Sequence, residues 1–167
     1  MWIIISAIGA EICPHWIKLR MSSEEKRKSK LYFFENYEIP GIVGCIDGTH
    51  VRMVKPSEDE SLFYNRKGTF SMNAMIVSKP TPFSLPGSCH DAFIWNLSGA
   101  RQFFLNQYED GDRNSWLLGD SGYGLELFLM TPYRDVSVGT KEHKFNKKHT
   151  LTRSIIERTI GVLKSSF

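Results

Sequence analysis

Three acidic residues stand where the surrounding sequence is apolar. Asp47 lies within a stretch that reads as a buried strand, Asp120 ends a second apolar stretch, and Glu157 lies at the margin of an amphipathic one. Each carboxylate needs a cation, N–H donors or a metal, because burying it without a partner is costly. Carboxylates from two strand ends and one helix can converge on Mg²⁺ or Mn²⁺, and a pair of such ions can promote phosphodiester cleavage. Asp91, at the start of a predicted helix, is a fourth candidate ligand.

Simpler structural roles are open for the same acids. Asp91 could favour its helix N-terminus through the helix dipole, and Glu157 could pair with Arg153 one turn earlier. Asp47 and Asp120 each adjoin a glycine, so a turn carboxylate that accepts backbone N–H bonds is the alternative there. The apolar residues that precede Asp47 and Asp120 favour the functional role for that pair.

The histidines and cysteines show no metal-ligand spacing. Cys13, Cys45 and Cys89 are odd in number and form no CxxC pair, so we expect reduced thiols and an intracellular protein. His50 follows Asp47 by three residues and is a candidate hydrogen-bond donor in the second shell around that carboxylate. A surface or structural histidine fits position 50 equally well.

The charge is unevenly distributed along the chain. The formal net charge of +3 is too mild to indicate nucleic-acid binding by itself. Residues 141–167 hold seven basic and two acidic side chains, whereas residues 91–135 hold seven acidic side chains and three arginines. A basic segment next to carboxylates suits a metal site that handles phosphate, and a solvated charged face is the alternative.

The first half of the chain reads as a helix followed by a hairpin. Residues 22–37 are charged and end before Ile39-Pro40, as a helix does before proline. Residues 41–54 read as a long strand whose first half is buried on both faces. Residues 55–69 form a turn, and residues 71–77 read as a second strand.

The second half reads as helix, strand and helix. Three prolines between residues 79 and 88 leave room for only a short strand at 83–85. We expect a helix over 90–107 capped by Ser88, a loop over 109–114, a strand over 116–120 and an apolar element over 125–130. The last predicted helix, 151–167, carries one apolar stripe, formed by Leu151, Ile155, Ile156, Ile160, Val162, Leu163 and Phe167.

Size and composition favour one folded domain. The chain has 167 residues, with 41% hydrophobic and 23% charged, which lies in the globular range. The apolar run over residues 1–10 lacks a basic leader and is half the length of a membrane span, so we expect a packed helix rather than a signal peptide.

Five motifs in order resemble the PIF/Harbinger transposases and the nucleases derived from them. A sixth segment, CPHWIK at 13–18, looks like that family's approach to its catalytic domain. The five motifs are IPGIVGCIDGTHV at 39–51, YNRKG at 64–68, PGSCHD at 86–91, WLLGDSGY at 116–123 and SIIER at 154–158.

The resemblance implies a fold and a set of site residues. It implies an α/β, ribonuclease-H-like mixed sheet flanked by helices, with a truncated third strand, and a DDE-type endonuclease that uses a divalent metal cation. The metal ligands would be Asp47, Asp91, Asp120 and Glu157. We take as candidate phosphate contacts Arg66, Lys67, Lys144, Lys147 and Lys148.

The resemblance also implies surroundings and boundaries. Relatives act in the nucleus with a Myb-like partner that contributes DNA binding, so we expect DNA as a partner, no membrane, and a nuclear location with the cytoplasm as the alternative. Residues 1–39 would be a truncated helical lead-in. Residues 40–167 would be the nuclease domain, shortened near residues 78–86 and at its C-terminal end.

Two hypotheses follow. The first is a divalent-metal-dependent DNA endonuclease that hydrolyses phosphodiester bonds, with Asp47, Asp120 and Glu157 as catalytic carboxylates. The second is a catalytically inactive DNA- or protein-binding remnant of such a domain, or a truncated gene product.

Overall fold

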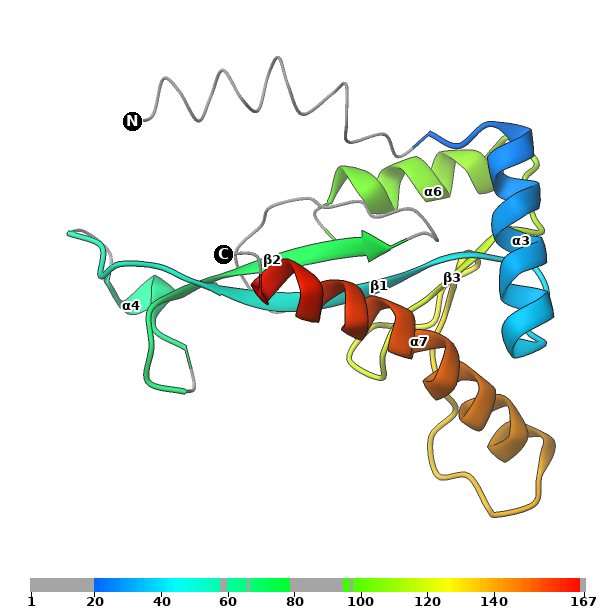
Figure 1. Ribbon diagram of the computed structural model, residues 1–167. Helices are drawn as coiled ribbons and strands as arrows, with labels where there is room; N and C mark the ends of the chain where they lie inside the picture. The colour runs from blue at the N-terminus through cyan, green and yellow to red at the C-terminus, as the bar shows by residue number, and fades with distance from the viewer. Residues whose placement is uncertain (1–19, 58–59, 66, 79–94, 97, 166–167) are drawn as a thin grey trace.

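A four-stranded mixed sheet forms the centre of the protein. The computed structural model describes residues 20–57, 60–65, 67–78, 95–96 and 98–165 (Figure 1). The strands are β1 (Ile42–Arg52), β2 (Ser71–Ser78), β3 (Trp116–Leu118) and β4 (Leu129–Met130), in the spatial order β2-β1-β3-β4. β1 and β2 are antiparallel, whereas β1, β3 and β4 are parallel. The sheet confirms the expected α/β class and is consistent with a ribonuclease-H-like fold.

Helices cover both faces of this sheet (Figure 1). The helices are α3 (Ser23–Tyr37), α4 (Glu60–Phe63), α6 (Gly99–Glu109) and α7 (Lys141–Ser165). One buried cluster joins Phe33 of α3 and Ile156 of α7 to Cys45 and Leu118 of the sheet. A second cluster places Phe104 of α6 against the opposite face. The sheet is therefore the middle of three layers, with α3 and α7 on one side and α6 on the other.

The first half of the chain matches the expected elements closely. α3 begins after Ser22, whose hydroxyl accepts the Glu25 backbone N–H while the Glu25 carboxylate accepts the Ser22 N–H, forming a capping box. β1 is buried from Ile42 to Ile46 and becomes exposed toward Arg52. The predicted turn over residues 55–69 contains the one-turn helix α4. The predicted hairpin is confirmed by eight antiparallel residue pairs.

The second half differs in where its helices begin. α6 begins at Gly99 with Ser98 as its N-cap, so the predicted helix over 90–107 is not one continuous helix, and its predicted cap Ser88 lies outside the described residues. α7 begins at Lys141, ten residues before the predicted start. Its predicted stripe is also corrected: Leu151 and Val162 are exposed, whereas Ile156 is fully buried. The predicted helix at 1–10, the short strand at 83–85 and residue 167 lie outside the described residues.

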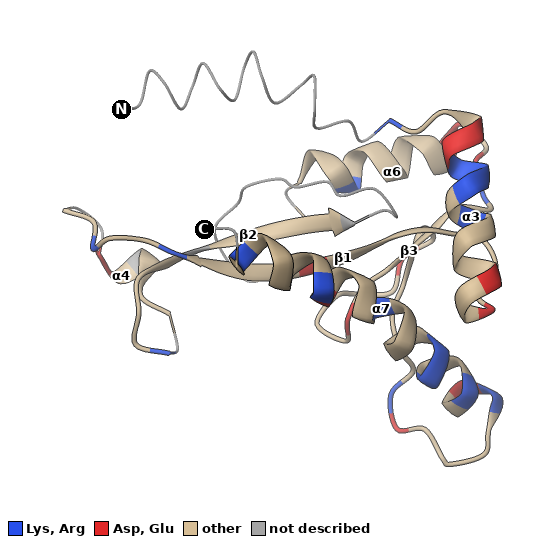
Figure 2. Ribbon diagram, in the orientation of Figure 1, with Lys and Arg blue, Asp and Glu red and all other residues tan. Residues whose placement is uncertain are grey.

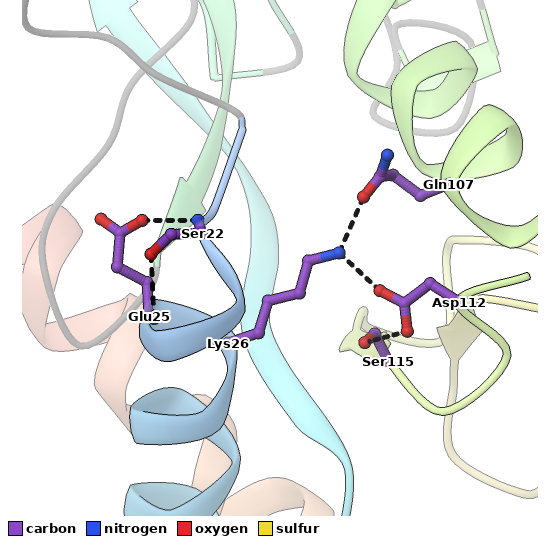
Figure 3. Close-up of polar contacts among 6 residues, drawn as sticks. All are labelled: Ser22, Glu25, Lys26, Gln107, Asp112 and Ser115. Atoms are coloured by element: carbon purple, nitrogen blue, oxygen red, sulfur yellow. Dashed lines mark hydrogen bonds and ion pairs between the residues drawn. The ribbon is translucent and has the colours of Figure 1, made fainter. Parts of the chain in front are cut away.

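A polar cluster fixes α3 to the end of α6 (Figure 3). The Lys26 ammonium group donates to the Gln107 side chain at 2.7 Å and to the Asp112 carboxylate at 2.5 Å. The Ser115 hydroxyl donates to the other Asp112 oxygen at 2.7 Å. Because Ser115 directly precedes β3, this cluster ties the outer helix α3 to the start of that strand.

Candidate active site

Asp47 lies within β1, and Asp120 lies two residues beyond the end of the neighbouring strand β3. β1 and β3 are parallel, and their last residue pair is Cys45 with Leu118. Counting on two residues along each strand brings Asp47 opposite Asp120. Side chains two residues apart share a face of a strand, and Cys45 and Leu118 both pack in the cluster that contains Ile156 of α7. The register therefore puts both aspartates at the same end of the parallel pair, on the face that α7 covers.

Asp47 is held by two contacts on that face. One carboxylate oxygen accepts the backbone N–H of Gly48 at 2.9 Å. The other carboxylate oxygen lies 3.1 Å from the guanidinium of Arg153, a residue of α7. The side chains of Arg153 and Asp47 are 14% and 17% exposed, so this ion pair is largely sheltered from solvent. Asp47 thus has both a backbone N–H donor and a cation as partners, and a carboxylate in apolar surroundings needs such partners.

Asp120 begins the turn that follows β3. Its carboxylate accepts the Gly122 backbone N–H at 2.9 Å, and its carbonyl accepts the Tyr123 N–H at 3.2 Å. A Cβ atom at position 122 would lie 3.1 Å from the Asp120 carboxylate oxygen, so glycine there permits the close approach. The turn fixes one oxygen of Asp120 at the sheet edge.

His149 lies beside both charged groups. It is 2% exposed, and its Nε2 atom lies 3.5 Å from the Met130 carbonyl oxygen. Burial lowers the pKa of His149, and the Met130 carbonyl opposes that shift. The Arg153 guanidinium lowers this pKa further, while the Asp120 carboxylate raises it. His149, Arg153 and Asp120 are therefore close enough to interact electrostatically.

The sequence reasoning missed His149 as a member of this site. Residues 149, 153 and 157 are spaced four apart, so they follow one side of α7. The four-residue spacing of His149, Arg153 and Glu157 is the sequence feature that indicates a common side of one helix. It went unused because the predicted helix began only at residue 151.

Glu157 is exposed and lies one turn beyond Arg153 on α7. The buried residue next to it, Ile156, anchors this part of the helix against the sheet. Asp91 lies outside the described residues. Within the ranges given above, no three His, Cys, Asp or Glu side chains are close enough together to hold a metal ion as they stand. The β1–β3 register thus places Asp47 and Asp120 near the same end of the parallel pair, and Glu157 is exposed on α7.

His50 lies away from the Asp47 carboxylate. It pairs with Asn73 across the hairpin, and its Nδ1 atom lies 3.0 Å from the Ser71 hydroxyl. Three residues separate His50 from Asp47 along β1, so the two side chains alternate onto opposite faces. The structure therefore does not bring His50 to the carboxylate for which it was a candidate.

The candidate phosphate contacts divide between two places. Lys67 is exposed in the turn between β1 and β2, and Arg66 lies outside the described residues. Figure 2 shows basic residues along α7, where Lys144 and Lys147 are exposed. Lys148 pairs with Glu38 at 2.5 Å, which ties α7 to the end of α3. Lys148 is therefore engaged within the protein, unlike its exposed neighbours.

Cys45 confirms one expectation about the thiols. It is a free, fully buried cysteine on the α7 side of β1. Burial raises its pKa to about 12, opposed by the Arg153 guanidinium and reinforced by the Asp47 carboxylate. Cys45 is thus an inert, packed thiol, and Cys13 and Cys89 lie outside the described residues.

Comparison with known proteins points to one family. A family model described as DDE superfamily endonuclease matches residues 46–167. "Putative nuclease HARBI1" of Bos taurus is 35% identical over 136 residues, and the protein of that name in Homo sapiens is 33% identical over 136 residues. Each alignment covers 77% of this chain and 38% of the relative. "Protein ALP1-like" of Arabidopsis thaliana is 27% identical over 148 residues, covering 75% of this chain and 36% of the relative.

The chain therefore spans less than two fifths of the length of these relatives. No solved structure matches it. None of the described helices is both long enough and apolar enough to span a membrane.

Proposed function

This chain belongs to the DDE superfamily endonucleases, and from that premise we propose that it is a divalent-metal-dependent DNA endonuclease that hydrolyses phosphodiester bonds. The observation that carries the proposal is the register of β1 and β3. Its last pair is Cys45 with Leu118, and extending it by two residues would bring Asp47 level with Asp120 on the face that α7 covers. Both aspartates and Glu157 fall within the matched residues 46–167.

The donor set fits a hard divalent cation. Carboxylate oxygens are the ligands that Mg²⁺ and Mn²⁺ prefer, and no sulfur or imidazole ligand is needed. Asp47 and Asp120 would hold the metal from the sheet, with Glu157 from α7 and Asp91 completing the set. A divalent ion there would neutralise charge on the scissile phosphate and lower the pKa of a bound water.

The chain's own residues would orient these ligands. The Gly48 and Gly122 backbone N–H groups each hold one carboxylate oxygen, so the second oxygen of each aspartate would be the ligand atom, and on Asp47 that oxygen now pairs with Arg153. Glu157 is exposed on α7, the helix that covers this face, and would supply a third oxygen.

DNA is the proposed substrate because exposed cations lie on α7, the helix that supplies Arg153, and in the turn between β1 and β2. Lys144 and Lys147 on α7 and Lys67 in the turn after β1 are exposed, and with Arg66 they are the proposed phosphate contacts. Lys148 would join them only by leaving Glu38. The nuclear location, the Myb-like partner and the division into a lead-in (residues 1–39) and a nuclease domain (residues 40–167) remain proposals based on the family resemblance.

One observation favours a second candidate function. The Arg153 guanidinium already satisfies Asp47, and the described residues hold no preassembled group of three metal-binding side chains. A domain with that arrangement could bind DNA or a protein without cleaving. The two candidates differ in whether DNA that binds is also cut.

The test is plasmid nicking by the purified chain with Mg²⁺ or Mn²⁺. We expect nicking that EDTA abolishes, and a loss of about a hundredfold or more for Asp120→Asn, the scale on which removal of one stabilising group slows an enzyme. Asp110→Asn is the matched control, because it makes the same change in charge at an exposed residue that caps α6, on the opposite face of the sheet from α7. Circular dichroism would establish that both variants are folded.

Nicking that persists without metal, or equally in Asp120→Asn, would contradict the endonuclease proposal. A folded sample that shifts DNA in a gel without nicking it would instead support the inactive binding domain.

A further inference from the structure

Arg153 is incompletely satisfied in its present position. One of its terminal nitrogen atoms lies 3.1 Å from the Asp47 carboxylate. Its Nε atom is buried, and among the described residues it has no hydrogen-bond partner. A guanidinium is most stable when its fork of N–H groups binds a carboxylate in two places, and leaving a buried donor unpaired is costly. The contact with Asp47 therefore satisfies only part of the Arg153 guanidinium, and a partner that also accepted from its Nε atom would bind it more strongly.

The cation on Asp47 also occupies the oxygen that the proposed metal site needs. The Gly48 N–H holds one carboxylate oxygen of Asp47, and Arg153 holds the other. A divalent ion on that oxygen would lie beside the Arg153 guanidinium, and their like charges repel each other. The position of Arg153 on a long helix anchored by Ile156 lets its side chain move while the backbone stays fixed.

We propose that Arg153 is the counter-ion of Asp47 in the metal-free protein and that divalent metal binds this site only by displacing it. This inference rests on the metal site of the proposed function. Arg153 is then a positioning residue: it holds the Asp47 carboxylate in place before metal arrives, and it sets how tightly metal binds. Once released from Asp47, the Arg153 guanidinium could pair with the Glu157 carboxylate, which lies four residues later on α7.

Arg153→Gln tests the proposal through metal binding rather than cleavage. We expect Mn²⁺, titrated by electron paramagnetic resonance, to bind about tenfold more tightly than to the unchanged chain, because a competing cation has been removed. The melting temperature without metal should fall, since Asp47 loses its counter-ion. Added Mn²⁺ should then raise the melting temperature of the variant by more than it raises that of the unchanged chain.

Arg158→Gln is the matched control for charge. Arg158 lies on the same helix and is exposed, so its removal changes the net charge equally without touching Asp47. We expect its Mn²⁺ affinity to stay within about twofold of the unchanged chain. Arg153→Lys, which keeps the charge and loses the guanidinium fork, should bind Mn²⁺ with intermediate affinity. It decides the question if Arg153→Gln does not fold.

Three results would overturn the counter-ion proposal. The first is Mn²⁺ binding to Arg153→Gln that is equal to or weaker than binding to the unchanged chain. The second is a loss of melting temperature that is the same with and without Mn²⁺, as a purely structural role would give. The third is an equal change in Arg158→Gln.

Asp120→Asn separates this failure from failure of the proposed function. If the unchanged chain binds Mn²⁺ and Asp120→Asn loses it, while Arg153→Gln binds no more tightly, only the counter-ion proposal fails. If Mn²⁺ binds neither the unchanged chain nor Arg153→Gln, the metal site fails and the counter-ion proposal with it. Binding that appears only in Arg153→Gln supports the counter-ion role.

Discussion

Gly41 is the residue on which the alignment of the two aspartates depends. It has φ of 77°, and its carbonyl accepts the Trp116 backbone N–H at 3.0 Å. A Cβ atom at this position would lie 2.3 Å from the Trp116 ring, much closer than van der Waals contact. Glycine thus lets β1 start directly against β3, and the pairing that begins here, shifted by one residue between Ile42 and Gly44, ends with Cys45 opposite Leu118, two residues before each aspartate.

Gly41→Ala should therefore destabilise the protein by about 3 kcal/mol, from left-handed backbone strain plus the clash with Trp116. Gly68→Ala is the control, because Gly68 has φ of 73° and a Cβ there would meet only the Tyr64 hydroxyl at 3.4 Å. It should cost about 1 kcal/mol, from backbone strain alone. Urea unfolding measures both changes, and equal losses for the two variants would contradict the close-packing account.

At the scale of elements, the helices α3 and α7 hold in place the end of the β1–β3 pair where the aspartates lie. α7 supplies Arg153 and Ile156 on the face that bears the aspartates. α3 holds the loop before β3 through Lys26 and Asp112, whose side chains are 20% and 25% exposed (Figure 3). Burial raises the pKa of Asp112, but hydrogen bonds from Lys26 and Ser115 outweigh it and hold the pKa below its usual range.

This shift predicts a pH dependence of stability. A carboxylate with a lowered folded-state pKa adds stability above its unfolded pKa of about 3.9, and that contribution is lost as pH falls through the folded value. Asp112→Asn should therefore lower the free energy of unfolding by about 1–2 kcal/mol at pH 7. It should also flatten the loss of stability below about pH 4.

Asp110→Asn is the neighbouring control, because Asp110 is exposed. Chemical unfolding between pH 3 and pH 7 makes the comparison. An Asp112→Asn profile parallel to that of the unchanged chain would argue against the Lys26 cluster as a brace.

At the scale of the whole molecule, local signals predicted more than long-range ones. The capping box at Ser22 and the apolar half of β1 are encoded by near neighbours in the chain, and both are confirmed. The length of α7 was underestimated because residues 141–150 are too polar to show a stripe, although they continue the helix. Leu151 and Val162 fit the angular stripe yet are exposed, because the angle does not tell which turns of a helix lie over the sheet.

The candidate site shows the same division. Asp47 and Asp120 were predicted from their apolar flanks, and the family resemblance is confirmed by the match over residues 46–167. The contact between Arg153 and Asp47 joins residues more than a hundred positions apart. It depends on how α7 packs across the sheet, so no local pattern could predict it. The spacing instead suggested Glu157 as the partner of Arg153.

The whole protein thus presents an acidic sheet edge beneath a basic helix, and the central claim is that this edge binds a divalent metal between Asp47 and Asp120. The most direct measurement is the anomalous diffraction of crystals grown with saturating Mn²⁺. We predict a strong anomalous peak bonded to one oxygen of each aspartate, with the Arg153 side chain moved away from Asp47. A peak elsewhere, or none while Arg153 still pairs with Asp47, would contradict the account.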